Sequence, residues 1–202
     1  MNRLLVATTN PGKIAEYRAL LKSVPLDRVG LREAGINLDI EEAGSTFEEN
    51  ALVKGRTCAQ ASGLLTLADD SGLCVDALGG APGVFSARYA RSDRARIERL
   101  LGEMQGVPEH QRSARFVCVI ALASPDGEAR TFEGVCEGRI AHQPSGVNGF
   151  GFDPVFNLPD YSHTMAELPL SVKNRISHRA RAAAQARAWL IENLTRGSAR
   201  VS

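Results

Sequence analysis

The chain has 202 residues, 44% of them hydrophobic and 23% charged, which is the balance of a globular protein able to bury a core. Its formal net charge of +1 excludes a protein that is held on nucleic acid by a broadly basic face. The sequence shows neither a secretory signal nor an apolar run of about 18 residues that would span a membrane. We therefore expect a cytoplasmic protein without a nucleic-acid or membrane partner.

The cysteine spacing and the lack of repeats or linkers indicate how the chain is organised. The four cysteines form no C-x-x-C pair and lie among apolar residues, so we expect buried, reduced thiols. No internal repeat or Pro/Ser-rich linker divides the chain. Residues 1–202 are therefore expected to form a single domain.

The first predicted elements are a short buried strand over residues 3–8 and a helix over residues 14–22. Between them stands "TTNPGK", which ends in Gly12 and Lys13. Backbone N–H groups at a helix start point toward an anion, Gly12 lets the backbone approach it, and Lys13 adds a charge. The segment lacks the Walker pattern. Its residues also suit a plain strand-to-helix turn with Pro11 at the first helical position.

The next stretch is "IEEAGSTFEENALVKGR". Thr46 and Glu49 have the spacing of a capping box, which predicts a helix from there to about residue 62, ended by Gly63. On this helix Asn50 and Lys54 share a face away from the apolar stripe, where polar residues usually serve solubility. The adjacent carboxylates of Glu41 and Glu42 could instead serve a metal together with a phosphate.

An apolar strand over residues 64–68 is expected to end at "DDSG", which begins with Asp69 and Asp70. Carboxylates at a strand end lie where α/β proteins build their sites. Two adjacent acids repel each other, so at least one needs a cation or hydrogen-bond donor. Mg²⁺ takes such oxygen ligands and couples them to phosphates. The alternative is a polar turn that caps the strand.

The second half of the chain predicts a helix over residues 91–104, two strands over 114–123 and 130–141 joined through "SPDGEA", and one closing helix over 171–194. The class is therefore α/β with a mixed sheet. In "GVNGFGFDPVF", glycines flank Phe150, whose ring could stack on a flat ligand. Lys173, His178 and Arg179 begin the closing helix and offer donors to a base edge or a phosphate, or else form a solvated face.

Five motifs occur along the chain in one order: "TTNPGK", "EEAGSTFEENALVKG", "ADDSGLCVDALGGAPGVFSARY", "GFGFDPVF" and "SHRA". Together they resemble the inosine/xanthosine triphosphate pyrophosphatase family, and most closely its bacterial members. The resemblance implies an elongated central mixed sheet flanked by helices, two lobes with a cleft between them, and a homodimer. It also implies Mg²⁺-dependent hydrolysis of ITP, dITP and XTP to the monophosphate and pyrophosphate.

The resemblance also assigns roles to residues of this chain. Asp70 matches the general base and a metal ligand, and Glu41 matches the second metal ligand, with Glu42 so close that the choice between them stays open. The remaining matches are substrate-binding residues: Thr8, Thr9, Asn10, Pro11, Gly12, Lys13, Lys54, Ser71, Phe150, Gly151, Phe152, Asp153, Lys173, His178 and Arg179. Two departures from the family pattern are Thr9, where Gly is frequent, and Phe152, where Tyr is frequent.

Two other interpretations remain open. A nucleotide-binding module without catalysis would keep the first loop and the Phe150 loop but would need no competent acids, whereas Asp69 and Asp70 are both present. A related pyrophosphatase could act on modified pyrimidines or other altered nucleotides. Replacing Asp70 with Asn would separate a catalyst from the binding module, because a catalyst should lose turnover while binding survives, and a comparison of substrates would decide the other interpretation.

Overall fold

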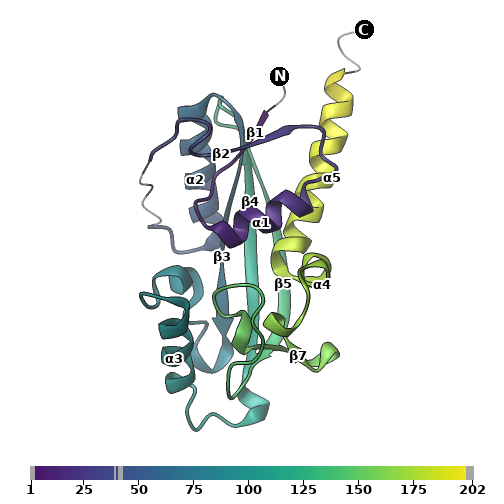
Figure 1. Ribbon diagram of the computed structural model, residues 1–202. Helices are drawn as coiled ribbons and strands as arrows, with labels where there is room; N and C mark the ends of the chain where they lie inside the picture. The colour runs from purple at the N-terminus through teal and green to yellow at the C-terminus, as the bar shows by residue number, and fades with distance from the viewer. Residues whose placement is uncertain (1–2, 39, 41–42, 199–202) are drawn as a thin grey trace. The chain divides into compact units, whose positions relative to one another are not determined.

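The computed structural model describes residues 3–38, 40 and 43–198, with side chains as far as residue 194 (Figure 1). Within these residues seven strands form one sheet in the order β2-β1-β3-β4-β5-β6-β7. The strands are β1 Arg3–Val6, β2 Asp27–Gly30, β3 Leu65–Val75, β4 Ser113–Ala123, β5 Ala129–Ile140, β6 Phe156–Leu158 and β7 His163–Thr164. The α-helices are α1 Pro11–Leu20, α2 Phe47–Ser62, α3 Asp93–Glu103, α4 Leu170–Ile176 and α5 His178–Ser198.

The sheet is mixed, as the sequence predicts. Strand β1 pairs in parallel with β2 and β3, whereas β6 pairs antiparallel with β5 and β7. Parallel neighbours need a crossover, and the chain supplies one with α1 between β1 and β2. The α/β class with helices flanking a mixed sheet is thereby confirmed.

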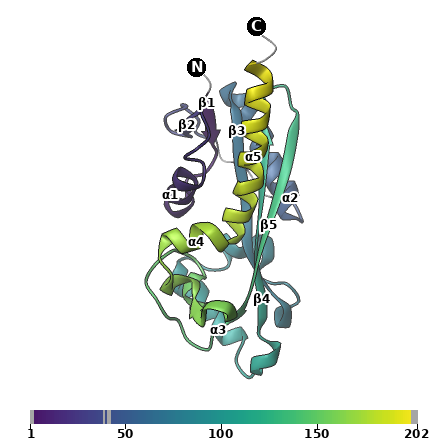
Figure 2. The ribbon, with the colours of Figure 1, turned by 90° about the vertical axis from the view of Figure 1, so that its right-hand side faces the viewer.

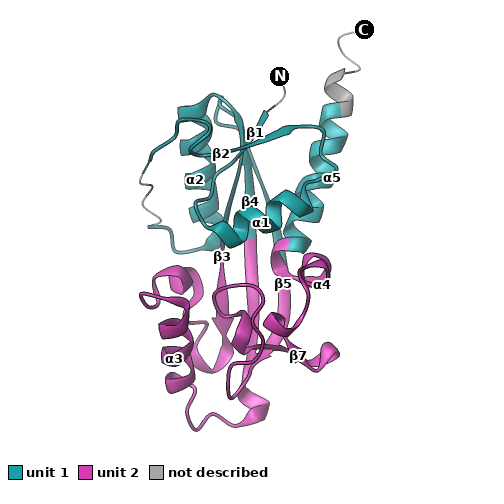
Figure 3. Cartoon of the chain, viewed as in Figure 1, with its two compact units in different colours: residues 1–70, 119–134, 180–202 teal, residues 71–118, 135–179 magenta. Residues whose placement is uncertain are grey.

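The chain divides into two compact units (Figure 3). Unit 1 contains residues 1–70, 119–134 and 180–202, and unit 2 contains residues 71–118 and 135–179. Each unit is therefore assembled from segments that are far apart in the sequence.

In unit 1, helices α2 and α5 lie on opposite faces of the strands (Figure 2). Helix α2 packs on β4 through Ala51, which is buried with Val119 and Ala121. Gly55 of α2 makes this approach close, because an added Cβ would lie 3.3 Å from the Cβ of Ala123. Helix α5 buries a row of small and apolar side chains: Ala180, Ala182, Ala183, Ala186 and Leu190.

In unit 2, helix α3 packs its apolar stripe into a second core. Ile97, Leu100 and Met104 are buried there together with Phe116 of β4 and Phe156 of β6. Leu101 is partly buried against the same cluster. The spacing of these apolar residues is the one that predicted the helix.

Several local predictions are confirmed. Thr46 and Glu49 form the capping box of α2, and Gly63 ends that helix in the left-handed conformation at φ 67°. All four cysteines are free, and Cys58, Cys118 and Cys136 are buried while Cys74 is partly exposed. In the part of the chain that the structure describes, no helix has both the length and the apolar character needed to cross a membrane.

Two predicted elements are wrong in their bounds. Strand β3 does not end at Asp69 but runs through the whole "DDSG" segment to Val75. The closing helix is two helices, α4 and α5, separated by Ser177, whose backbone is extended at φ −68° and ψ 159°. Lys173 and His178 therefore lie in different helices. The sequence reading also missed the short strands β2, β6 and β7.

Candidate active site

The first predicted loop has the geometry of a capped helix start. Asn10 is the N-cap of α1, and its Oδ1 accepts a hydrogen bond from the Lys13 N–H at 3.1 Å. Thr8 Oγ1 accepts from the Asn10 N–H at 3.2 Å, and Pro11 occupies the first helical position. Thr9, Asn10 and Pro11 are exposed. This end of α1 is positive and open to an anion.

Lys13 also reaches a buried acid. Its Nζ lies 2.9 Å from Oδ2 of Asp69, and the Asp69 side chain is only 1% exposed. The sequence predicted that one of the adjacent acids would need a cation, and Lys13 is that cation. A paired acid can be buried within a strand, which explains why β3 continues through Asp69 rather than ending there.

Helix α2 supplies the partner of the second acid. Asn50 is 1% exposed and donates from Nδ2 to Oδ2 of Asp70 at 3.0 Å. Its own Oδ1 accepts from the Gly44 N–H at 2.8 Å, which fixes the orientation of the amide. Gly44 is required there, because an added Cβ would lie 2.7 Å from that oxygen.

The sequence reading placed Asn50 on a solvent-facing surface, and this is wrong. The spacing of Asn50 from Lys54, one helical turn further on, is the sequence signal that could have indicated its role. Lys54 Nζ donates to the backbone oxygen of Asp69 at 3.2 Å. Asn50 and Lys54 therefore both turn from α2 toward the acids of β3. Unit 1 thus brings together Lys13, Lys54, Asn50, Asp69 and Asp70.

The described donors fit Mg²⁺ only in part. Among the described residues no three His, Cys, Asp or Glu side chains gather as a metal site, and Glu41 and Glu42 lie outside those residues. Asp70 uses one carboxylate oxygen for Asn50, and a carboxylate offers about four lone-pair sites. Because Mg²⁺ is commonly held by one or two carboxylates plus phosphates and water, Asp70 suits a metal that arrives with a nucleotide.

Unit 2 holds the predicted aromatic loop. Asp153 is 2% exposed, its Oδ2 accepts from the Phe150 N–H at 2.9 Å, and the same oxygen pairs with the buried Lys173 ammonium. Lys173 Nζ lies 4.7 Å from the centroid of the Phe150 ring, and the Arg179 guanidinium carbon lies 5.6 Å from it. A half-buried ring flanked by two cations is suited to contact a flat, electron-rich ligand.

Glycine at position 149 is a steric requirement of this loop. Its φ is +76°, and an added Cβ would overlap Oδ2 of Asp153. Gly151, on the other side of Phe150, has φ +64° but open space around it. The two glycines that the sequence reading singled out therefore give the loop its shape for different reasons.

The start of α5 contributes two buried side chains. The His178 ring stacks on Phe116 at 4.7 Å between centroids and is 4% exposed. Arg179 is 1% exposed, and its Nη2 donates to Ser71 Oγ at 2.8 Å. Both are thus removed from solvent, and the interpretation of a solvated helix face is wrong for them.

Phe152 is 4% exposed and packs edge-on against Tyr89, with ring centroids 6.1 Å apart. The Tyr89 hydroxyl donates to the carboxylate of Glu103, and Arg99 lies over the Tyr89 ring at 4.0 Å. Burial, reinforced by the bond to Glu103, raises the pKa of Tyr89 to about 12. The same hydrogen bond lowers the pKa of Glu103.

The described contacts of the predicted site residues fall into two groups, each within one unit. Unit 1 has a helix start, two lysines and two buried acids, and unit 2 has an aromatic loop flanked by Lys173 and Arg179 with His178 close by. An α/β protein with these parts is of the class that handles phosphorylated, ring-bearing ligands.

The chain belongs to the Ham1 family, whose sequence model matches residues 4–189. It is 49% identical over 185 residues to the dITP/XTP pyrophosphatase of Bacillus licheniformis, covering 90% of this chain and 94% of that protein. The Geobacter sulfurreducens protein of the same name is 50% identical over 187 residues, covering 91% of this chain and 94% of that protein. These matches confirm the resemblance inferred from the motifs.

The fold agrees with solved structures of relatives. The structure of a Ham1 protein from Coxiella burnetii is 43% identical and matches with a TM-score of 0.87, covering 95% of this chain and all of that one. The Ham1 protein of Staphylococcus aureus is 42% identical and matches with a TM-score of 0.85, with the same coverage.

Proposed function

We propose that the protein hydrolyses the non-standard purine nucleoside triphosphates ITP, dITP and XTP to the monophosphate and pyrophosphate, and so removes them from the nucleotide pool. The enzyme class is confirmed by its relatives, which are named dITP/XTP pyrophosphatases. One structural observation carries the proposal for this chain: two buried acids of β3 lie against Lys13, Lys54 and Asn50 in the unit that also holds the open start of α1.

Asp70 is the proposed general base. Its carboxylate is 6% exposed and is oriented by Asn50, so it can hold a water molecule in line with a phosphorus atom and accept the proton of that water. Asp69 is already paired with Lys13 and is less suited to this role. Lys54 and the start of α1 would bind the phosphate oxygens while the phosphoanhydride bond breaks.

We propose Mg²⁺ as the cofactor, held by Asp70 and by one of Glu41 and Glu42. When bound, the ion would neutralise charge on the phosphate oxygens as pyrophosphate leaves. The support is the carboxylate of Asp70, because carboxylate oxygens are ligands that Mg²⁺ prefers.

Selection of the base is assigned to unit 2. A 6-oxo purine offers an acceptor where adenine offers an amino donor. A buried donor of His178 or Arg179 would match the acceptor, and with adenine that donor would lose this partner at a cost of about 1–3 kcal/mol. The Phe150 ring, whose centroid lies 4.7 Å from Lys173 Nζ and 5.6 Å from the Arg179 guanidinium carbon, would contact the face of the base.

The test is pyrophosphate release from dITP, ITP, XTP, dATP and GTP, each with Mg²⁺ and with a chelator. We expect turnover of the first three to exceed that of the last two, and chelation to abolish it. Equal turnover of all five nucleotides, or turnover of none, would contradict the substrate assignment. Activity that survives chelation would overturn the proposed cofactor.

The homodimer and the cytoplasmic location implied at the level of sequence remain predictions. Light scattering coupled to size-exclusion chromatography would decide the oligomeric state. A mass of one chain across the micromolar range would contradict the dimer.

A further inference from the structure

The loop that presents Phe150 is anchored from two sides. On the inner side, Asp153 accepts the Phe150 N–H and pairs with Lys173. On the outer side, the Gly151 N–H donates to Oδ2 of Asp93 at 2.8 Å. Asp93 is the first residue of α3 and lies outside every motif that carried the family resemblance.

Both oxygens of the Asp93 carboxylate have a defined partner. Oδ2 binds the Gly151 N–H, while Oδ1 accepts from Arg96 Nη1 at 2.6 Å. Arg96 is itself held by the backbone oxygens of Ala87 and Ala90. Arg96, which also donates to the backbone, thus holds the half-exposed Asp93 carboxylate next to the loop.

Capping does not explain this arrangement. Ser92 caps α3, and its Oγ accepts from the Ala95 N–H at 3.2 Å. Asp93 adds a charge favourable to a helix start, as any first-turn acid does. The bond of Asp93 to Gly151, 58 residues further along the chain, instead ties the start of the helix to the loop.

The bond acts on the peptide unit next to the ring. This unit joins Phe150 to Gly151. The Phe150 carbonyl oxygen accepts a hydrogen bond from the Asp153 N–H at 3.3 Å, and the Gly151 N–H donates to Asp93. Gly151 has φ +64° with open space around it, so sterics alone do not hold this peptide in one orientation. The position of the Phe150 ring therefore depends on the hydrogen bonds at both ends of the unit.

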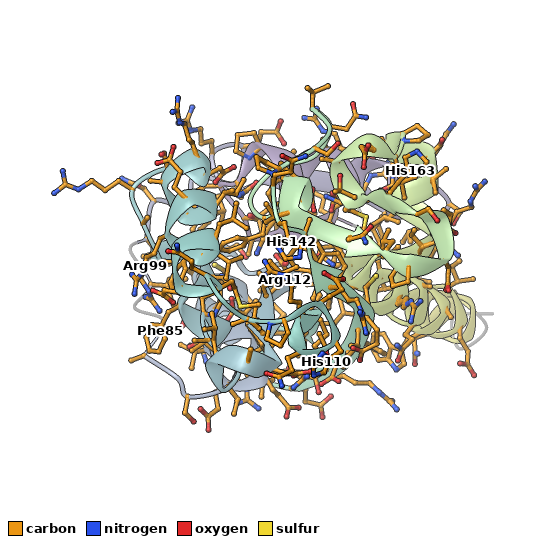
Figure 4. The ribbon with its side chains drawn as sticks, turned by 90° about the horizontal axis from the view of Figure 1, so that it is seen from below. Phe85, Arg99, His110, Arg112, His142 and His163 are labelled. Carbon is orange, nitrogen blue, oxygen red and sulfur yellow. The ribbon has the colours of Figure 1, made fainter. Side chains whose placement is uncertain are left out.

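We propose that Asp93 is a positioning residue for base recognition: through the Gly151 N–H it fixes the Phe150 ring between Lys173 and Arg179. The inference rests on the proposed function, because it assigns Phe150 to the purine. A second contact supports it: Tyr89, which precedes α3 and is covered by Arg99 of that helix, packs on Phe152 of the same loop. Figure 4 labels Arg99 on α3.

The experiment compares Asp93→Ala, Asp93→Asn and the control Glu98→Gln. Glu98 is an exposed acid of the same helix, and its ion pair with Arg94 lies within that helix. With dITP, D93A is expected to raise KM about tenfold and to leave kcat within about twofold, because a contact shared by ground and transition states is lost. Asn keeps an acceptor oxygen, so D93N should stay within about threefold of wild type. E98Q should match wild type.

Two inhibitors separate positioning from general damage. Inosine monophosphate carries the base, whereas tripolyphosphate carries only the phosphates. D93A should weaken the binding of inosine monophosphate about tenfold and leave the binding of tripolyphosphate unchanged. Three results would overturn the proposal: D93A weakens the binding of both inhibitors equally, D93A leaves the KM for dITP unchanged, or D93N raises that KM as much as D93A does.

Amide hydrogen exchange of Gly151, followed by NMR without any nucleotide, keeps this test separate from the proposed function. D93A should exchange the Gly151 amide about tenfold faster, while E98Q should not. If wild type fails to hydrolyse dITP, the substrate assignment fails. In that case the exchange rates still test whether Asp93 anchors the Gly151 N–H. Equal exchange rates in D93A and wild type would overturn that anchoring role.

Discussion

Asp70 lies in β3 with one oxygen bonded to the Asn50 amide. Asn at this position would still accept that hydrogen bond but could not accept a proton. We therefore expect Asp70→Asn to lower kcat by about 10²–10⁴-fold while nucleotide binding survives. Steady-state kinetics with dITP, and calorimetric titration with a non-hydrolysable analogue, measure the two effects. A variant with wild-type kcat would remove Asp70 from the chemistry, and one that no longer binds nucleotide would show that its role is not confined to catalysis.

Lys13 neutralises Asp69, which has 1% of its side chain exposed. Lys13→Met would remove the ion-pair partner of a buried carboxylate, and we expect a loss of about 3 kcal/mol in the free energy of unfolding. The double variant Lys13→Met/Asp69→Asn removes both charges and should recover most of that loss. Urea unfolding at equilibrium gives both values. A single variant as stable as wild type would show that this pair does not support the fold.

At the scale of elements, α2 carries Asn50 and Lys54 to the acids, and its start is fixed by the Thr46 capping box. Thr46→Ala should cost about 1 kcal/mol of stability. Thr57→Ala, inside the same helix, is the matched control and should change stability by less than about 0.5 kcal/mol. The comparison uses the same urea unfolding. Equal losses in the two variants would show that the cap has no special role.

The Tyr89–Glu103 contact makes α3 sensitive to alkali. The pKa of Tyr89 is raised to about 12, so the protonated hydroxyl stabilises the fold below its ordinary value of 10.0, and this contribution is lost as the pH rises through about 12. The chain has three tyrosines, and phenolate absorbance compared between wild type and Tyr89→Phe isolates this one. A difference signal that titrates near pH 10 would contradict the buried contact.

The elements themselves were largely predictable, because their signals are local. The capping box, the Gly63 stop and the apolar stripe of α3 each lie within a few residues of what they determine. The course of β3 was not predictable, because a buried Asp69 is tolerated only when Lys13 is already in contact with it. The break at Ser177 was missed for a similar reason: the flanking Ala- and Arg-rich residues all favour helix, and tertiary contacts override that preference.

At the scale of the whole molecule, the sequence singled out candidate site residues but not the contacts that they make. Lys13 and Asp70 stood out because they lie beside a glycine and a predicted strand, and Lys173 and Arg179 because they begin the predicted closing helix. Asn50 did not, since its role depends on Asp70, 20 residues further on. Asp93 was missed because its partner, Gly151, is 58 residues away and offers only a backbone N–H.

The segmental build of unit 1 leads to a prediction for truncated chains. Residues 180–190 of α5 cover one face of its strands with buried side chains that end at Leu190. A chain that ends at Arg179 should therefore lose cooperative thermal unfolding, whereas one that ends at Leu194 should keep it. Circular dichroism during heating distinguishes the two. A cooperative transition in the shorter chain would show that unit 1 is stable without α5.

The place of α5 in the chain also has a consequence for biosynthesis. A ribosome releases the loop before α1 and both acids of β3 early, and the buried side chains of α5, within residues 180–190, late. At about 5–20 residues per second, the strands of unit 1 wait some seconds before residues 180–190 cover one of their faces. The nascent chain thus carries Lys13, Asp69 and Asp70 before it has the part of the core that α5 supplies.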